Sequence, residues 1–314
     1  MANILLIGEP MGLFSATETG SIADNDYFRK SIAGAELNVG IGLARLNHQV
    51  NYITRLGEDQ IGKWIAKSIQ ANKMNTQYIT FSNSHTTGLM MKSKVEDGDP
   101  DTAYFRKGSA FTTLSINDVK QVDFSKIDVL HVTGIPPAVS ETVREAVFYL
   151  MKEAKESGTF VTFDPNLRPS LWDSPQLMVD VLNDLASYAD VVLPGVAEGK
   201  ALTGSEDIEE IATFYLNKGA QVVITKSGSD GAFITEKGQE TINVKGFKVE
   251  KVIDTVGAGD GFAVGILHGY LKGLSWKEAA VYANAIGSLQ VQHEGDNEGL
   301  PTEEALDDYI KKNK

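Results

Sequence analysis

The residues best suited to chemistry lie in one short segment near the C-terminus, Asp254-Thr-Val-Gly-Ala-Gly-Asp260. Three residues of minimal bulk, Gly257, Ala258 and Gly259, stand where an apolar helical segment begins. Glycines let several backbone N–H groups point into one small concavity, and the start of a helix adds about half a positive charge. The segment therefore predicts a site for a phosphate or a phosphoryl group.

Asp260 ends this segment, where a carboxylate would repel a phosphate unless it has a task. The task that fits is to accept a proton from an attacking hydroxyl group. The alternative is that Asp260 only caps the helix, as acidic residues often do. Further along the same helix, Gly265 and Gly269 are expected to allow close helix packing rather than to touch a ligand.

Short apolar runs separated by helical periodicity predict the scaffold that positions this segment. The expected strands are residues 3–8, 50–56, 129–134, 160–164, 190–194 and 221–225, and the clearest expected helices are residues 37–46, 140–156 and 207–218. Such alternation predicts β-α-β units and a mostly parallel sheet, an α/β fold with helices flanking the sheet. Ligands of these sheets bind beyond the carboxyl ends of the strands.

Two stretches, residues 12–30 and 86–108, break this alternation and look like polar strands and turns. Residues 87–91 and 102–106 are expected to pair across a turn at residues 96–100. We interpret the two stretches as a small β-sheet attached to a single domain of residues 1–314. An ordinary surface hairpin is the alternative.

Composition limits the classes of partner. The 314 residues are 42% hydrophobic, carry a net charge of −13 and include no cysteine. An acidic surface repels nucleic acids and anionic lipids, so neither nucleic acid nor membrane is an expected partner. Without cysteine there are no disulfides or thiolate metal sites, and the five histidines show no ligand spacing. The N-terminus lacks a signal-peptide pattern, so a cytoplasmic location is expected.

Three ordered motifs resemble those of the ribokinase-like, or PfkB, carbohydrate kinases. The segment 254–260 is similar to the C-terminal signature of that family, Ala33-Gly-Ala-Glu-Leu-Asn38 to its N-terminal glycine–asparagine signature, and Thr225-Lys-Ser-Gly-Ser-Asp-Gly-Ala232 to its nucleotide loop. The resemblance runs almost from end to end. It implies a doubly wound α/β fold with a small β-sheet lid formed by about residues 12–30 and 86–108. It also implies transfer of a phosphoryl group from ATP to a sugar.

The resemblance also implies roles for individual residues. Asp260 would be the catalytic base, and the N–H groups from Gly257 through Ala258 and Gly259 to Asp260 would stabilise the moving phosphoryl group. ATP would lie along residues of the nucleotide loop and of the segment after the 160–164 strand: Asn166, Arg168, Lys226, Ser227, Gly228 and Gly231. A solvated surface lysine is an equally good interpretation of Lys226.

Mg²⁺ would accompany ATP, and Glu198 fits the acidic position of the family's metal motif. Gly195 stands where asparagine is usual, which leaves open how the metal is positioned. Oxygen ligands that act through water suit this ion. The alternative is that Glu198 is simply an acidic residue at the start of a helix.

Several segments are similar to a narrower branch, the 2-keto-3-deoxygluconate kinases: Gly8-Glu-Pro10, residues 104–110, residues 134–140, residues 163–172 and residues 193–199. The branch implies an acidic sugar phosphorylated at its 6-hydroxyl. Two arginines, Arg106 and Arg168, are expected near the site in a chain that is acidic overall. A guanidinium group holds a carboxylate through two parallel hydrogen bonds, and a surface ion pair is the alternative for each arginine.

The remaining expected sugar contacts are Gly34, Ala35, Asn38, Tyr104 and Asp296, of which Asp296 and Gly34 could instead be plain loop and turn residues. Met90 stands where this branch is expected to carry tyrosine, so a fructokinase or another ketose or aldonate kinase is the alternative.

Two rivals come from other classes of protein. One is a sugar- or nucleotide-sensing binding protein on the same scaffold, although the intact Gly-Ala-Gly-Asp favours an enzyme. The other is a dinucleotide oxidoreductase, but the first strand ends without the spaced glycines of that class. Lids in the PfkB family often pair between subunits, so a homodimer through the lid is a further expectation.

Overall fold

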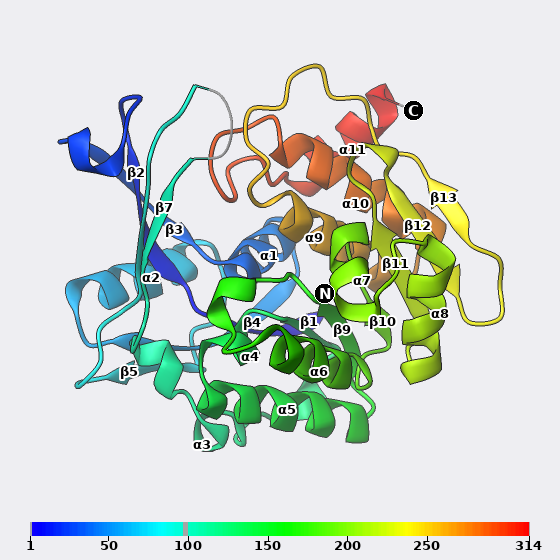
Figure 1. Ribbon diagram of the computed structural model, residues 1–314, viewed down its shortest axis with the longest axis horizontal. Helices are drawn as coiled ribbons and strands as arrows, with labels where there is room; N and C mark the ends of the chain where they lie inside the picture. Colours follow the sequence, from blue (N-terminus) through cyan, green and yellow to red (C-terminus); the bar gives the residue numbers. More distant parts are fainter. Residues whose placement is uncertain (1, 97–99, 314) are drawn as a thin grey trace.

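The computed structural model describes residues 2–96 and 100–313, and it is built around one large sheet (Figure 1). The strand order is β13-β12-β11-β10-β9-β8-β1-β4-β5. Their bounds are β1 (Asn3–Ile7), β4 (Gln49–Gly57), β5 (Ile79–Ser82), β8 (Val129–Thr133), β9 (Phe160–Asp164), β10 (Val191–Val192), β11 (Val222–Lys226), β12 (Ala232–Glu236) and β13 (Ile242–Val244). From β11 to β5 all neighbours are parallel, whereas β12 and β13 are antiparallel. The predicted fold class is confirmed.

Helices cover both faces of this sheet, and β1 shows why its residues are apolar without alternation. Ile4 and Leu6 belong to one core, whereas Leu5 and Ile7 belong to the other. The first core is closed by α1 (Ala35–Arg45), α2 (Gln60–Ala71), α9 (Ala258–Leu271), α10 (Trp276–Gln290) and α11 (Glu303–Lys312). The second is closed by α3 (Ile116–Val119), α4 (Pro136–Val139), α5 (Glu141–Glu156), α6 (Pro175–Ala186), α7 (Val196–Thr203) and α8 (Ile208–Lys218). A strand buried on both faces must be apolar throughout.

The helix that begins in the glycine-rich segment is α9, and it packs closely on α10. A Cβ atom added at Gly265 would lie 2.3 Å from the Cα of Ala283, and one added at Gly269 would lie 2.5 Å from the Cβ of Ala279. Any larger residue at these positions would force the two helices apart. The predicted packing role of these glycines is confirmed.

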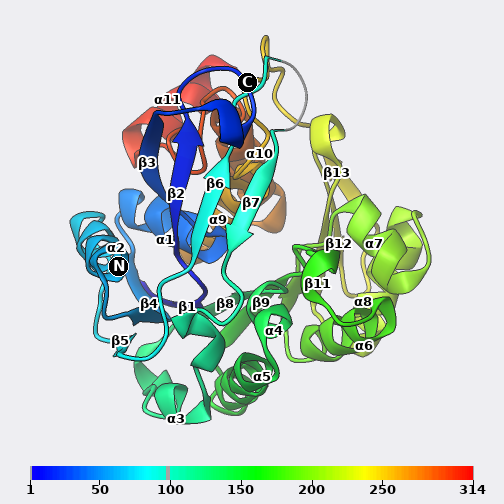
Figure 2. The same cartoon turned by 60° about the vertical axis from the view of Figure 1, so that its left-hand side comes forward.

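A second sheet has the order β3-β2-β6-β7 and rises beside the β1–β4 side of the large sheet (Figure 2). Its strands are β2 (Met11–Ala16), β3 (Phe28–Ala33), β6 (Leu89–Lys92) and β7 (Thr102–Phe105). Strands β6 and β7 are antiparallel neighbours, as predicted, with Met90 opposite Tyr104. The predicted turn at residues 96–100 includes residues 97–99, which lie outside the described residues. These four strands form one sheet, so β6 and β7 are not an isolated surface hairpin.

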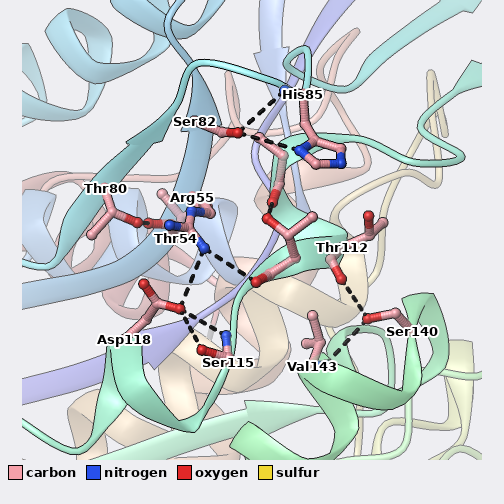
Figure 3. A network of polar contacts seen from close by, with 12 residues as sticks. Thr54, Arg55, Thr80, Ser82, His85, Thr112, Ser115, Asp118, Ser140 and Val143 are labelled. Carbon is pink, nitrogen blue, oxygen red and sulfur yellow. Dashed lines mark hydrogen bonds and ion pairs between the residues drawn. The ribbon is translucent and has the colours of Figure 1, made fainter.

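Polar contacts fix the base of this small sheet to the main domain (Figure 3). Arg55 of β4 donates from Nη1 to the carbonyl of Thr113 (3.2 Å) and lies 3.4 Å from Asp118. The hydroxyl of Ser140, which caps α5, donates to the carbonyl of Thr112 (2.7 Å). These bonds hold the segment that leaves β7, so the sheet has a firm base beside the large sheet.

A span of the lipid bilayer would need a long apolar helix, and none of the helices in the described part of the chain meets that requirement.

Candidate active site

One large cavity, about 1040 Å³, opens at the carboxyl ends of the parallel strands and faces the small sheet. It brings together most of the predicted site residues: Gly34, Ala35, Asn38, Tyr104, Arg106, Asn166, Arg168, Glu198, Lys226, Gly257, Gly259, Asp260 and Asp296. Its size suits a small ligand with a nucleotide beside it. Four predicted residues are not part of its lining: Ala258, Ser227, Gly228 and Gly231.

The glycine-rich turn begins with Gly257, which has a left-handed φ of 77° and precedes α9. A Cβ atom there would lie 2.2 Å from the carbonyl oxygen of Asp296, so only glycine fits. At Gly259 an added Cβ atom would meet no protein atom within 4 Å. Packing within the protein therefore does not require glycine at position 259, whereas close approach of a ligand would.

Most backbone donors of this turn are free to bind a ligand. The N–H of Ala258 donates to the carbonyl of Thr255 (3.3 Å). The N–H groups of Gly257, Gly259 and Asp260 make no hydrogen bond to the part of the protein that the structure describes. Unpaired N–H groups at a helix start attract anions, so this turn can hold a phosphoryl group.

Asp260 is buried, and its carboxylate contacts side-chain amides rather than the start of its own helix. Asn38 donates from Nδ2 to Oδ2 (2.8 Å), and Asn166 approaches Oδ1 from Nδ2 at 3.5 Å. Asn297 in turn donates to the side-chain oxygen of Asn38 (3.2 Å). Burial raises the pKa of Asp260, and the Asn38 hydrogen bond and the charges of Arg168 and Lys226 oppose this rise. The carboxylate is thus held in one orientation toward the cavity.

Asn166 has an unusual backbone for a residue with a side chain, because its φ is 39°. Asparagine tolerates this left-handed conformation better than most residues. Conformations of this kind concentrate at functional sites. Here it accompanies the contact between the Asn166 amide and Asp260.

Lys226 ends β11 and is a partly buried, paired lysine rather than a solvated one. Its Nζ lies 2.8 Å and 2.7 Å from the two carboxylate oxygens of Asp164, and 3.7 Å from Glu198. Burial raises the pKa of Asp164 to about 6, and Lys226 opposes this. Burial lowers the pKa of Lys226, but Asp164 and Glu198 raise it above its ordinary value. Asp164 was missed from the sequence, although its place at a strand end was a usable signal.

The remaining nucleotide-loop residues lie beyond the cavity. Gly231 has a φ of 87°, and an added Cβ atom would lie 2.1 Å from the carbonyl oxygen of Val244. This glycine is required by the path of the chain itself. Gly228 has a φ of 53° and faces open space. Ser227 lies between Lys226 and this turn, and its N–H donates to the carbonyl of Gly231 (2.9 Å).

Glu198 was predicted to help position Mg²⁺, and its carboxylate is already partly engaged. It accepts hydrogen bonds from the N–H of Leu167 (2.9 Å) and from the N–H of Gly195 (2.6 Å). Within residues 2–96 and 100–313 no group of three or more acidic, histidine or cysteine side chains is placed to hold a metal. Each oxygen of Glu198 keeps a free lone pair, so the site fits an ion that is bound mainly by phosphates and water.

On the opposite side of the cavity, Arg106 is paired with Glu9, a residue whose role the sequence analysis missed. Arg106 approaches Oε2 of Glu9 from Nε (2.8 Å) and Nη2 (2.5 Å), and Ser109 donates to Oε1 (2.5 Å). Glu9 is 3% exposed. Arg106 is therefore not a surface ion pair, and Nη1 has no protein partner in the described part of the chain.

Arg168 differs from Arg106, because it is exposed at the rim and has no acidic partner among the described residues. Its Nη1 donates to the carbonyl of Leu167 (2.9 Å). Tyr104 is 54% exposed and lines the same cavity. An unpaired guanidinium and a phenol hydroxyl at the mouth are suitable donors to an anionic ligand.

Two further carboxyl groups in the cavity wall are buried. Burial raises the pKa of Asp296 to about 7, an effect that Lys92 opposes. Burial likewise raises the pKa of Glu36 to about 7, although its hydrogen bond with Thr133 opposes the rise. Gly34 precedes Glu36 with a φ of 147°, and an added Cβ atom would lie 3.0 Å from the carbonyl oxygen of Glu9. Carboxyl groups whose pKa values are raised by burial are common at functional sites.

Comparison with known proteins agrees with this geometry. The family described as pfkB family carbohydrate kinase matches residues 1–303. A 2-dehydro-3-deoxygluconokinase of Bacillus subtilis (strain 168) is 44% identical over 304 residues, which cover 96% of this chain and 94% of that protein. A protein of the same name from Thermoproteus tenax is 30% identical over 99% of this chain and 95% of its own length.

Two solved structures add what their proteins bind. A fructokinase from Vibrio cholerae O395, with fructose, ADP and calcium ion bound, has a TM-score of 0.86 and 27% identity, and covers 99% of both chains. A protein from E. coli in complex with ATP and Mg²⁺ has a TM-score of 0.89 and 25% identity, and covers 99% of this chain and 100% of its own.

Proposed function

The chain belongs to the PfkB family of carbohydrate kinases, and on that premise we propose that it phosphorylates 2-keto-3-deoxygluconate, also called 2-dehydro-3-deoxygluconate, at its 6-hydroxyl. It is a sugar kinase that uses ATP. The choice of substrate follows the names of the two relatives and the two arginines at the cavity.

One observation carries the proposed chemistry. The free N–H groups of Gly257 and Gly259 and the buried carboxylate of Asp260 line one cavity. Phosphoryl transfer requires little covalent chemistry from the protein, and it depends on position and on charge stabilisation. An anion-binding turn beside a fixed base supplies both requirements.

The proposed reaction assigns each step to a residue of this chain. The sugar oxygen forms a bond to the γ-phosphorus while the bond from phosphorus to the β,γ-bridging oxygen breaks. The hydroxyl proton passes to Asp260, and the products are the sugar 6-phosphate and ADP. The N–H groups of Gly257 and Gly259 stabilise the charge on the phosphoryl oxygens, and Lys226 adds a positive charge nearby.

Magnesium, when bound with ATP, neutralises charge on the phosphates and orients them. Glu198 would hold it through water molecules, because both carboxylate oxygens already accept backbone hydrogen bonds. Gly195 leaves no side chain where the family usually places an amide, so Glu198 would do this without a neighbouring asparagine.

The substrate carboxylate is proposed to lie between Arg168 and the free Nη1 of Arg106. Asn38, Gly34 and Ala35 would border the sugar from the large domain, and Tyr104 from the small sheet. Met90 lies in the apolar cluster of the small sheet with Met11, Leu13 and Ala33, so it offers the sugar an apolar contact. We propose that the small sheet acts as a lid over this sugar, attached to a single domain that spans the chain.

The alternative substrate is fructose or another neutral ketose, and one observation favours it. Glu9 already balances the charge of Arg106, so the cavity wall is less positive there than the sequence suggests. ADP formation should therefore be measured with 2-keto-3-deoxygluconate, fructose, tagatose and ribose. Preference for a neutral sugar that survives Arg168→Ala and Arg106→Ala would exclude the acidic substrate. Sugar binding without ADP release would favour a sensing protein.

The homodimer through the small sheet remains a proposal. Phe105 of β7 and Tyr27, beside β3, expose large aromatic side chains. Exposed aromatic groups of this kind are common at protein interfaces. Light scattering of the protein, with a Phe105→Lys variant as the comparison, would test it.

A further inference from the structure

We propose that Lys92, a residue of the small sheet, positions the phosphate-binding turn through an ion pair with Asp254. Lys92 would thereby link the sugar side of the cavity to the nucleotide side. The inference rests on the proposed placement of the ATP phosphates at the turn from Gly257 to Asp260.

Lys92 reaches into the cavity because of its place on β6. Side chains alternate between the faces of a strand, so Lys92 shares a face with Met90. Both residues line the cavity. The Nζ of Lys92 lies 3.0 Å from Oδ2 of Asp254, and the two side chains are only 13% and 14% exposed. This pair is far better shielded from solvent than a typical surface ion pair.

Asp254 connects the segment just before the turn to the loop that contains Gly295. Its Oδ1 accepts the N–H of Val256 (3.0 Å), and its Oδ2 lies 3.5 Å from the N–H of Gly295. Gln290 ties the same two segments, because its Nε2 donates to the carbonyls of Val256 (3.2 Å) and Gly295 (2.6 Å). The carbonyl of Asp296, next to Gly295, packs against Gly257. A shift of Asp254 would therefore move the turn.

The side chains of the segment before the turn add little further support, although the N–H groups of Ile253 and Asp254 donate to the carbonyl of Val291 (2.8 Å and 3.3 Å). Val252, Ile253 and Val256 are exposed rather than packed into a core. The Lys92–Asp254 contact is the one ion pair, among the described residues, that joins the small sheet to the C-terminal part of the chain. Other contacts of the small sheet lie at its base, where Arg106 meets Glu9 and Thr87 meets Asp59, and on its opposite face, where Lys30 lies over Trp64 of α2. Lys92 thus couples the position of the small sheet to the position of the turn.

Charge gives the pair a second consequence. Asp254 and Asp296 are acidic groups close to the place proposed for the ATP phosphates. Lys92 neutralises Asp254 and opposes the rise in the pKa of Asp296. Without Lys92, an uncompensated carboxylate would remain beside the phosphates and repel them. Loss of Lys92 should therefore affect phosphoryl transfer and ATP affinity rather than the affinity for sugar.

The test compares three variants of the full chain. Lys92→Met should lower kcat by about 10–100-fold and raise the KM for ATP, since a displacement of about 1 Å at the reacting groups costs as much. The KM for sugar should change less than about threefold on the same reasoning. Lys92→Arg, which keeps the charge, should recover most of the activity. The matched control is Lys30→Met: Lys30 lies on the opposite face of the small sheet, over the ring of Trp64, and its loss should change nothing.

A double-mutant cycle tests the ion pair itself. Asp254→Asn should cause a loss similar to that of Lys92→Met, and the double variant should lose little more, because the two residues act as one unit. Additive losses, or full kcat in a folded Lys92→Met protein, would overturn the positioning role. If Lys92→Met is silent while Asp260→Asn is inactive, only this inference fails. If both are silent, the proposed phosphoryl site is wrong as well.

Discussion

The cavity has two sides, one proposed to bind the sugar and the other proposed to bind the nucleotide. The protein groups that form the two sides differ. On the sugar side, Glu9, Arg106 and Ser109 form a buried network, and Glu36 bonds to Thr133 beneath it. On the nucleotide side, the turn at Gly257 and Gly259 presents backbone N–H groups without protein partners, and the preceding segment exposes its apolar side chains. On the side proposed for the sugar, most polar groups are already paired within the protein and Nη1 of Arg106 is left open, whereas the N–H donors on the side proposed for the nucleotide are open to water or to a phosphate.

This difference separates the tasks of selection and transfer. A buried polar network rejects ligands that leave its members unpaired, which makes it suited to recognising one sugar. Backbone amides recognise only charge and shape. This is sufficient for a phosphate group, because that group is the same in every reaction cycle. Substitutions on the two sides should therefore fail in different ways.

The largest expected effect comes from Asp260, where the two sides meet. Asp260→Asn should lower kcat by about 10²–10⁴-fold, because the amide cannot accept the hydroxyl proton. In the wild-type protein, burial raises the pKa of Asp260 above its ordinary value, so activity should fall as the pH drops through that raised value. Steady-state rates against pH, with the thermal midpoint as a folding control, check this. A folded variant with normal turnover would remove Asp260 as the base.

Arg106→Ala should destabilise the sugar side of the cavity. Removing one partner of a buried ion pair leaves Glu9 without its cation, at a cost of about 3–5 kcal/mol in the free energy of unfolding. Denaturant unfolding measures this change, and the KM for the sugar should rise with it. The double variant Glu9→Gln, Arg106→Ala should recover part of the stability. Stability equal to the wild type in the single variant would mean that the network does not hold the sugar side together.

Glu36, on the sugar side, should make the stability of the protein depend on pH. Because burial raises its pKa from 4.5 to about 7, the folded state binds a proton that the unfolded state has lost between these values, and stability falls as pH rises through that window. Glu36→Gln removes this dependence. The variant should gain about 0 kcal/mol at pH 4.5 and roughly 3 kcal/mol at pH 8 relative to the wild type. Equal gains at both pH values would contradict the buried, titrating carboxyl.

The smallest expected effect tests the nucleotide side. Gly259→Ala places a methyl group in space that no protein atom occupies, so the fold should tolerate it while the phosphate is pushed away. The KM for ATP should rise by about tenfold, which is about 1.4 kcal/mol. Gly287→Ala in α10 is the matched control, since its Cβ atom would make only an ordinary contact, 3.5 Å from the carbonyl of Ala258. An unchanged KM for ATP in Gly259→Ala would place the phosphates elsewhere.

The sequence was sufficient for the scaffold because its signals are local. Each predicted strand run appears in the large sheet, and the pairing of β6 with β7 was predicted from short polar strands. The pairs Asn38–Asp260, Arg106–Glu9 and Lys226–Asp164 join residues 222, 97 and 62 positions apart. Such pairs depend on how distant elements and loops meet in the fold, so local patterns suggested single residues but not their partners. The only sequence signal for the left-handed backbone of Asn166 is the asparagine itself, which is too weak to predict it.

The amide contacts around Asp260 have a consequence for how each cycle ends. Asn38 and Asn166 present amide nitrogens to its two oxygens, and an amide nitrogen does not take up a proton at ordinary pH. If Asp260 is the base, as proposed, neither neighbour can relay its proton, and the proton would leave to water through the cavity mouth. Loss of this proton and release of the product would then share one exit, and turnover would be slower in deuterated water wherever loss of the proton limits the rate.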